Sequence, residues 1–402
     1  MDPRSVFCPN PDCSARGLIG VGKIGVHSRK RRRYRCRVCG KTFSDRRGTV
    51  YFRLRTPSGR VTLVITLLAY GCPLRAIVRA FGLDERTVAA WRDRAGDHCQ
   101  RVQQARVAQG ELDLEHVQAD EIRVKVCAGI AWLASAVMVR TRLWLGGVVG
   151  LQRERSLADR LLQQVRACAR SGRALLVCVD GWHVYPPAIR RAFREKLPRA
   201  GRRGRCRLQV WQGLAIARVV KHIRGVRVAK EEIVHGPAEL VGQQLFRSQG
   251  GVRINTAFIE RLNATFRERL AVLTRRCRHA ARRLEALQAG MYLIGTVYNF
   301  CTCHHALRLP NFDAPTRPRW RQRTPAMASD LTDHVWTVHE LLGFRIAPPA
   351  YVPPKRRGPP PKGRLPEPRW TIPRRCPCPP GAPWPGAPPG FERRSQPVLA
   401  TF

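Results

Sequence analysis

The spacing of apolar positions divides most of the chain into extended and helical stretches. Short apolar runs rich in β-branched residues, typical of strands, lie at 114–126, 130–139, 142–150 and 174–180. Two helix-like segments, 155–170 and 254–273, lie among them. The first three runs predict an antiparallel meander, which a helix then links to a fourth strand. This alternation predicts an α/β domain over residues 112–308.

Residues 73–96 predict two short amphipathic helices. The first ends in a turn at Gly82, and Asp84 can cap the second, in which Val88 and Trp91 would face inward. This spacing is typical of a helix-turn-helix, placed here in a DNA-binding domain over 57–110, although such helix pairs also occur in ordinary cores. The residues of the second helix that would face the major groove are Arg86, Thr87 and Arg92.

Two cysteine pairs lie within the first 50 residues. Cys8 and Cys13 form one pair, and Cys36 and Cys39 form the other. Four thiolates in two close pairs fit tetrahedral zinc, so a zinc ribbon is predicted over residues 1–50. The alternative is four unrelated buried cysteines, but neither pair lies in an apolar run.

The net charge of the chain is the strongest indication of its binding partner. Lys and Arg number 73 against 28 for Asp and Glu, a formal net charge of +45. A polyanionic partner explains such self-repulsion most simply, and double-stranded DNA is the expected one. A basic run from Arg29 to Arg60 includes Arg31, Arg32 and Arg33, which are expected to contact phosphates. A membrane-surface protein is the rival, but no basic amphipathic helix or lipidation motif supports it.

The chain has no recognisable signal peptide, and its best apolar run, 61–71, is far shorter than the roughly 20 residues of a membrane span. A cytoplasmic, nucleoid-associated protein with reduced cysteines is therefore expected. Residues 309–402 are expected to be a basic tail. Pro, Arg and Gly crowd 348–389, a composition typical of disorder. A second basic stretch, 198–207, looks like an insertion.

Three carboxylates stand out against this background. Asp180 ends a strand that reads as fully buried, so it is either a cap for the following turn or a ligand on a rigid support. Asp120 interrupts an alternating strand. Glu260 lies beside the apolar stripe of the 254–273 helix and shares its face with Asn263 and Arg267, although an exposed surface Glu is the plain alternative. Three strands, a helix and a fourth strand, with these acids, match an RNase H-like sheet.

The blocks "DGWHVYPPAI", "NTAFIERLNATFRERLAVLTRRCRH" and "AGMYLIGTVYNFCT" resemble the catalytic region of bacterial insertion-sequence transposases, closest to the insertion-sequence 1 type. The resemblance covers about residues 6–308. It implies that Asp120, Asp180 and Glu260 are an Asp-Asp-Glu triad, and that Asn263 and Arg267 are polar positions of the third block, expected near DNA. The tail from 309 has no match.

Three hard oxygen ligands suit two Mg²⁺ (or Mn²⁺) ions about 4 Å apart, which serve cleavage and strand transfer. His183, His304 and His305 could be acid-base groups, but this mechanism does not require them. The chain is thus expected to be a multidomain DNA transposase acting as a dimer or larger assembly. The alternatives are a catalytically inactive, transposase-derived DNA-binding regulator and a nuclease of the same fold.

Overall fold

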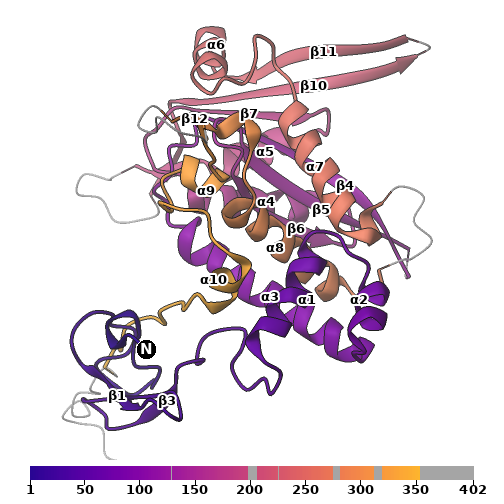
Figure 1. Ribbon diagram of the computed structural model, residues 1–402. Coiled ribbons are helices and arrows are strands. Elements are labelled where there is room, and N and C mark those ends of the chain that lie inside the picture. Colours follow the sequence, from indigo (N-terminus) through magenta and orange to yellow (C-terminus); the bar gives the residue numbers. More distant parts are fainter. Residues whose placement is uncertain (128, 198–205, 225, 275–280, 312–318, 354–402) are drawn as a thin grey trace, which may run out of the picture. The chain divides into compact units, whose positions relative to one another are not determined.

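A computed structural model describes residues 1–127, 129–197, 206–224, 226–274, 281–311 and 319–353 (Figure 1). The chain divides into two compact units, 1–351 and 352–402. The predicted disorder of the Pro-rich stretch falls mostly on residues 354–402, and the basic insertion mostly on 198–205. Both lie outside the described residues.

A six-stranded mixed sheet forms the centre of the first unit, so the expected α/β class is confirmed. Its strand order is β11-β10-β7-β4-β5-β6 (Figure 1). The strands are β4 (His116–Val126), β5 (Gly129–Met138), β6 (Trp144–Gly150), β7 (Leu175–Asp180), β10 (Leu214–Arg224) and β11 (Val226–His235).

The pairing confirms the predicted meander, because β5 runs antiparallel to both β4 and β6. Strand β7 pairs with β4 and β10 in parallel, and β11 returns antiparallel along β10. Residues Leu175–Val179 of β7 are all buried, whereas Asp180 is partly exposed. A parallel strand in the middle of a sheet is covered on both faces, which explains its uninterrupted apolar run.

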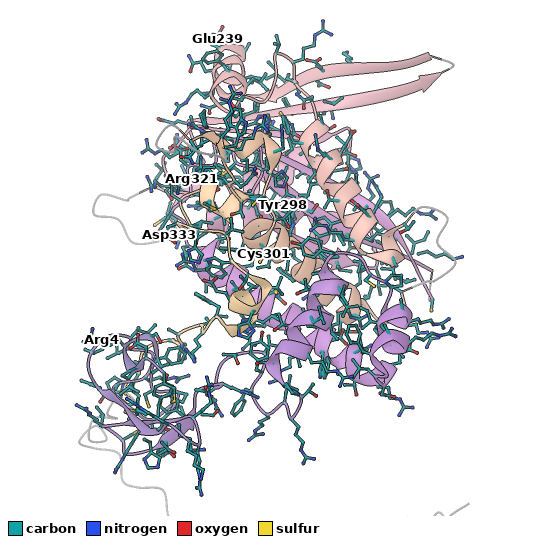
Figure 2. The ribbon with its side chains drawn as sticks, in the orientation of Figure 1. Arg4, Glu239, Tyr298, Cys301, Arg321 and Asp333 are labelled. Atoms are coloured by element: carbon teal, nitrogen blue, oxygen red, sulfur yellow. The ribbon has the colours of Figure 1, made fainter. Side chains whose placement is uncertain are left out.

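Helices cover both faces of the sheet. α6 (Ala238–Arg247) packs on β7 and β10 through Val241 and Leu245, and Figure 2 shows Glu239 on this helix, where it is exposed. The other covering helices are α4 (Arg155–Cys168), α5 (Tyr185–Ala192), α7 (Ala257–Arg269) and α8 (Leu284–Cys301). The short strands are β8 (Arg194–Lys196), β9 (Leu208–Val210), β12 (Leu309–Pro310) and β13 (Trp320–Arg321). No helix in the described ranges is long and apolar enough to cross a bilayer.

Three helices precede the sheet: α1 (Ser58–Ala69), α2 (Leu74–Phe81) and α3 (Glu85–Arg106). The predicted turn is present, since Gly82 adopts a left-handed φ of 58° and the Asp84 carboxylate accepts from the Thr87 N–H at 3.0 Å. α3 then runs on to pack against α8, where a Cβ on Gly96 would lie 2.3 Å from the Ala289 carbonyl oxygen. These helices and the sheet therefore share one hydrophobic core.

The first 50 residues form a separate small core around a three-stranded antiparallel sheet. Its strands are β1 (Ile24–Ser28), β2 (Arg33–Cys36) and β3 (Thr42–Ser44). Apolar Val6, Ala15, Ile24 and Tyr34 pack around the four cysteines. We call residues 1–50 the cysteine module.

The ordered fold extends well past residue 309, where the sequence placed the start of the tail. α9 (Pro325–Ala328) and α10 (Val338–Gly343) belong to the first unit, and Leu341 and Trp336 join its core. The Trp336 ring lies 4.6 Å from Phe300 of α8, the helix whose Tyr298 and Cys301 are labelled in Figure 2. Burial of these two side chains offsets part of the conformational entropy that the segment loses on folding. The described residues 319–351 therefore belong to the folded first unit, and their assignment to the tail was wrong.

Candidate functional site: an acidic pocket and a cysteine cluster

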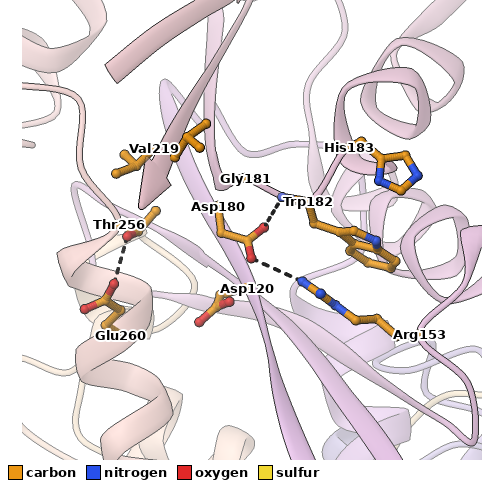
Figure 3. Close-up of a pocket in the computed structure, with 10 residues that line it drawn as sticks. Asp120, Arg153, Asp180, Gly181, Trp182, His183, Val219, Thr256 and Glu260 are labelled. Atoms are coloured by element: carbon orange, nitrogen blue, oxygen red, sulfur yellow. Dashed lines mark hydrogen bonds and ion pairs between the residues drawn. The ribbon is translucent and has the colours of Figure 1, made fainter. Parts of the chain in front are cut away.

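The three predicted acids line one pocket of about 520 Å³, which we call the acidic pocket (Figure 3). Asp120 projects from the middle of β4, Asp180 from the end of β7 and Glu260 from the first turn of α7. The paired register of β4 and β7 ends at Ala119 opposite Val179, so the next residue of each strand is one of the aspartates. The sheet thus places two of the acids side by side.

Gln118 fixes the third acid over the same strand. Its side-chain oxygen accepts from the backbone N–H groups of Phe258 at 2.9 Å and Ile259 at 3.1 Å, and its amide donates to the Asn255 carbonyl at 2.9 Å. These bonds satisfy N–H groups that the start of α7 leaves without helical partners. Gln118 and Asp120 are two residues apart and share one face of β4, so the anchor also sets Glu260 above the pocket.

The side-chain amide of Asn263 holds Asp120 in place. The Asn263 side-chain N–H donates to Asp120 Oδ2 at 2.8 Å, and Ser135 donates to the Asn263 oxygen at 3.3 Å. Asn263 is only 1% exposed. The sequence placed Asn263 on the face of α7 that meets the sheet, and it does lie there. Its amide is engaged with the acid rather than displayed on a surface.

The electrostatics of the pocket reflect crowding of like charges. Burial, together with the nearby charges of Asp180 and Glu260, raises the pKa of Asp120 to about 6. The Glu121 backbone N–H and the Arg267 guanidinium act in the opposite direction. A carboxyl that is hard to ionise beside two others is suited to a site whose charge a cation balances.

Glu121 belongs to this site as well, which the sequence analysis missed. One oxygen each of Asp120, Glu121 and Asp180 lie within 4.8 Å of one another, so this acidic group could bind a metal. Neighbouring residues of a strand point to opposite faces of the sheet. Because β7 ends at Asp180 while β4 continues, no paired strand lies between the side chains of Asp120 and Glu121 at this point. Burial, then the charge of Asp180, raises the pKa of Glu121 to about 7, although Arg153 opposes this. The sequence did contain a signal for Glu121, because two adjacent acids in an otherwise apolar strand are unusual.

Glu260 stands slightly apart from that group. It is exposed, and the Thr256 hydroxyl donates to its Oε1 at 3.0 Å (Figure 3). The cap reading of Asp180 is confirmed, because its Oδ1 accepts from the Trp182 N–H at 3.1 Å. Its carboxylate also lines the pocket, where it could serve as a ligand. The cap orients the side chain that a ligand would use.

Only one of the three histidines considered lies at the acidic pocket. His183 is exposed and lines it. His304 packs edge-on against Tyr298, with ring centroids 4.8 Å apart, and burial lowers its pKa to about 4. His305 follows it, and neither is among the residues that line the pocket.

The predicted recognition helix is the start of α3. Val88 and Trp91 are buried as expected, and Arg86 is exposed on the first turn. Arg92 differs, because its guanidinium is bound to Asp93 at 2.6 Å. Arg86 is thus the better placed of the two arginines to meet a groove.

The four cysteines of the module converge as their spacing predicts. Sγ of Cys8 lies 3.7 Å from that of Cys39, and Sγ of Cys13 lies 3.8 Å from that of Cys36. Tetrahedral zinc with bonds of about 2.3 Å would separate its sulfurs by about 3.8 Å. Burial would raise the pKa of Cys39, but the Lys41 backbone N–H and the neighbouring thiols lower it to about 7. The cluster could hold a zinc ion.

The basic run includes Arg31, Arg32 and Arg33, which lie at the turn between β1 and β2 of the same module. Arg31 is exposed, whereas Arg32 pairs with buried Asp45 at 2.5 Å and Arg33 donates to the Thr42 hydroxyl at 2.7 Å. The three arginines therefore differ: two of them also hold the module together.

Comparison of the chain with protein-family models and with curated proteins yields no match.

Proposed function

We propose that this chain is a metal-dependent DNA transposase that binds element ends and catalyses DNA cleavage and strand transfer. The observation that carries the proposal is the convergence of Asp120, Asp180 and Glu260 on one pocket from β4, β7 and α7. The strand order, with a meander followed by two parallel strands, supports an RNase H-like domain. The net charge of +45 supports a DNA partner.

The acidic pocket fits divalent cations by its donors. Carboxylate oxygens are the ligands that Mg²⁺ and Mn²⁺ prefer, and the crowded acids need a counter-charge. When bound, such ions would activate the attacking oxygen and stabilise the leaving one in an in-line phosphoryl transfer. The chain's own contribution is placement. Asn263 orients Asp120, the turn N–H orients Asp180, and Gln118 holds the helix that carries Glu260.

The other parts of the chain would hold the DNA. The cysteine module is expected to bind one zinc ion through Cys8, Cys13, Cys36 and Cys39, and its exposed arginines to contact phosphates. The start of α3 is expected to read base edges through Arg86. Acting on two element ends makes a dimer or larger assembly on DNA the working arrangement.

The test separates chemistry from binding. Asp120→Asn, Asp180→Asn and Glu260→Gln should each abolish cleavage and strand transfer of a marker flanked by the DNA that borders the gene. Gel shifts on the same ends should be nearly unchanged. Glu154→Gln is the matched control, since Glu154 is an exposed acid outside the pocket.

The other possible outcomes would change either the residues assigned to the triad or the proposed activity. Substantial cleavage by one of the three variants removes that residue from the triad. Cleavage without joining by the wild type indicates a nuclease of the same fold. End binding without cleavage indicates a transposase-derived regulator.

A further inference from the structure

Arg153 reaches into the acidic pocket from the loop between β6 and α4. Its Nε donates to Glu121 Oε1 at 2.5 Å, and its guanidinium contacts Asp180 Oδ2 at 3.3 Å (Figure 3). These acids are two of the three whose oxygens could hold a metal. A side-chain cation therefore already bridges two candidate metal ligands.

The two ion pairs of Arg153 differ in burial. The Glu121 side chain is 2% exposed and also accepts a hydrogen bond from the Tyr185 hydroxyl at 2.9 Å. The Asp180 side chain is 34% exposed. Losing the partner of a buried charge is far more costly than losing a longer contact open to water. The pair with Asp180 is thus the one that can be exchanged.

Two aromatic rings keep the guanidinium at the pocket. It lies 4.6 Å from the ring centre of Trp182 and 5.2 Å from that of Trp132. Cation–π contacts of this kind favour a positive charge at a fixed place. Together with Glu121 they anchor Arg153 independently of Asp180.

A divalent cation bound to Asp180 would meet this guanidinium. Two positive centres a few ångströms apart repel strongly in a half-buried pocket. Since Oδ1 already accepts from the Trp182 N–H and Oδ2 faces Arg153, a cation at Oδ2 displaces the guanidinium.

We propose that Arg153 is an exchangeable counter-ion of the acidic pocket. It holds Asp180 in place while the acids lack a metal, and yields Asp180 to a divalent cation while it stays anchored on Glu121. This inference rests on the proposed function insofar as Asp180 must bind such a cation. Arg153 is a positioning residue that weakens metal binding and keeps the ligand ordered in its absence.

The probe is Mn²⁺ alone, titrated into the zinc-loaded full chain and followed by electron paramagnetic resonance. Binding that survives in Asp180→Asn is subtracted. Arg153→Gln should bind Mn²⁺ about three- to tenfold more tightly than the wild type, because the competing charge is gone. Arg153→Lys keeps a positive charge at this place, so its Mn²⁺ affinity should stay within about twofold of the wild type.

Arg155→Gln is the matched control. It removes one charge two residues away, from a side chain that is 68% exposed and pairs with Asp159. It should leave Mn²⁺ affinity unchanged, which separates competition at Asp180 from a general change in charge. Circular dichroism verifies folding. If Arg153→Gln is unfolded, Arg153→Gln with Glu121→Gln is compared with Glu121→Gln alone, so that both proteins lack the same candidate ligand and differ only at Arg153.

An unchanged or weaker affinity in folded Arg153→Gln overturns the inference, because a merely structural arginine would give that result. An equal gain in Arg155→Gln does the same. Wild-type binding of Mn²⁺ without a gain in Arg153→Gln leaves the proposed function standing. If neither protein binds Mn²⁺ at the pocket, the proposed function and the inference both fail.

Discussion

The cysteine cluster and the acidic pocket are both candidate metal sites, yet they are built in opposite ways. Three of the four cysteines are buried, and all four lie in one short stretch with a core of its own. Asp120, Asp180 and Glu260 come from two strands and a helix and remain at least partly exposed. The acids of the pocket already have partners such as Arg153 and Thr256. A closed set of ligands is suited to stabilising a fold, whereas an open set leaves room for a substrate.

The largest effect should come from breaking the closed site. Cys36→Ser with Cys39→Ser should abolish binding of one zinc per chain and unfold the cysteine module. Zinc binding of roughly 10 kcal/mol or more is the folding energy of such small modules. Metal analysis of the purified protein and gel shifts on element ends measure the two results. We expect weaker DNA binding with Mn²⁺ affinity at the acidic pocket retained.

A wild type that contains no zinc removes this prediction. Loss of Mn²⁺ binding in the cysteine variant would show that the two sites depend on each other. The contrast between a structural and a chemical site would then be wrong.

The open site should reveal itself through pH. Without added Mg²⁺ or Mn²⁺, the pKa of Asp120 is about 6 in the folded protein and about 3.9 in the unfolded chain. A raised pKa means that its contribution to stability is complete below pH 4 and is lost as pH rises through 6. Asp120→Asn cannot ionise and avoids this loss. Its free energy of unfolding should exceed the wild-type value by about 2–3 kcal/mol at pH 7.

Urea unfolding of both proteins at pH 4, 5, 6 and 7 measures the difference. The difference in the free energy of unfolding should be close to zero at pH 4 and increase as the pH rises to 7. A difference that does not vary with pH would mean that burial does not hinder ionisation of Asp120. Added Mg²⁺ should favour the wild type at pH 7, because the metal needs the ionised carboxylate.

The sequence predicts a site well when the residues of the site lie close together along the chain, and less well when tertiary structure brings them together. The cysteines are local, so spacing alone predicted that they would converge. Asp120, Asp180 and Glu260 were found because strand β7 ends on a polar residue and because the Glu260 block carries a family resemblance. Their shared pocket depends on the pairing of β4 with β7, which only tertiary structure sets.

The residues that were missed lacked a local pattern. Arg153 is one arginine of a very basic chain, and nothing in a loop sequence shows that its guanidinium lies close to two tryptophan rings. The segment after 309 was assigned to the tail because the alternation of strand-like and helix-like segments and the family resemblance both end at about residue 308. Its order depends on Trp336 and Leu341 reaching a core formed by distant helices, which a one-dimensional pattern does not show.

The smallest effect concerns DNA contacts. It distinguishes the cysteine module, expected to bind phosphates, from the start of α3, expected to contact bases. Arg86 is exposed on the first turn of α3, where a guanidinium can reach base edges. Arg86→Ala should therefore cost about 1–3 kcal/mol on element ends and little on unrelated duplex. Lys30 and Arg31 are exposed in the hairpin turn of the cysteine module, with no helix to place them in a groove. Lys30→Ala with Arg31→Ala should weaken all DNA alike and reduce the salt dependence by up to about two phosphate contacts.

Arg32 is left intact in that variant because it neutralises the buried Asp45, and its loss would confuse binding with folding. Titrations of element-end and random duplexes at several salt concentrations measure both effects. The assignment fails if the hairpin variant loses only element-end binding while Arg86→Ala weakens both duplexes equally. In that case the cysteine module reads sequence and α3 holds the backbone, because a base contact is lost only with its base whereas a phosphate contact is present on every duplex.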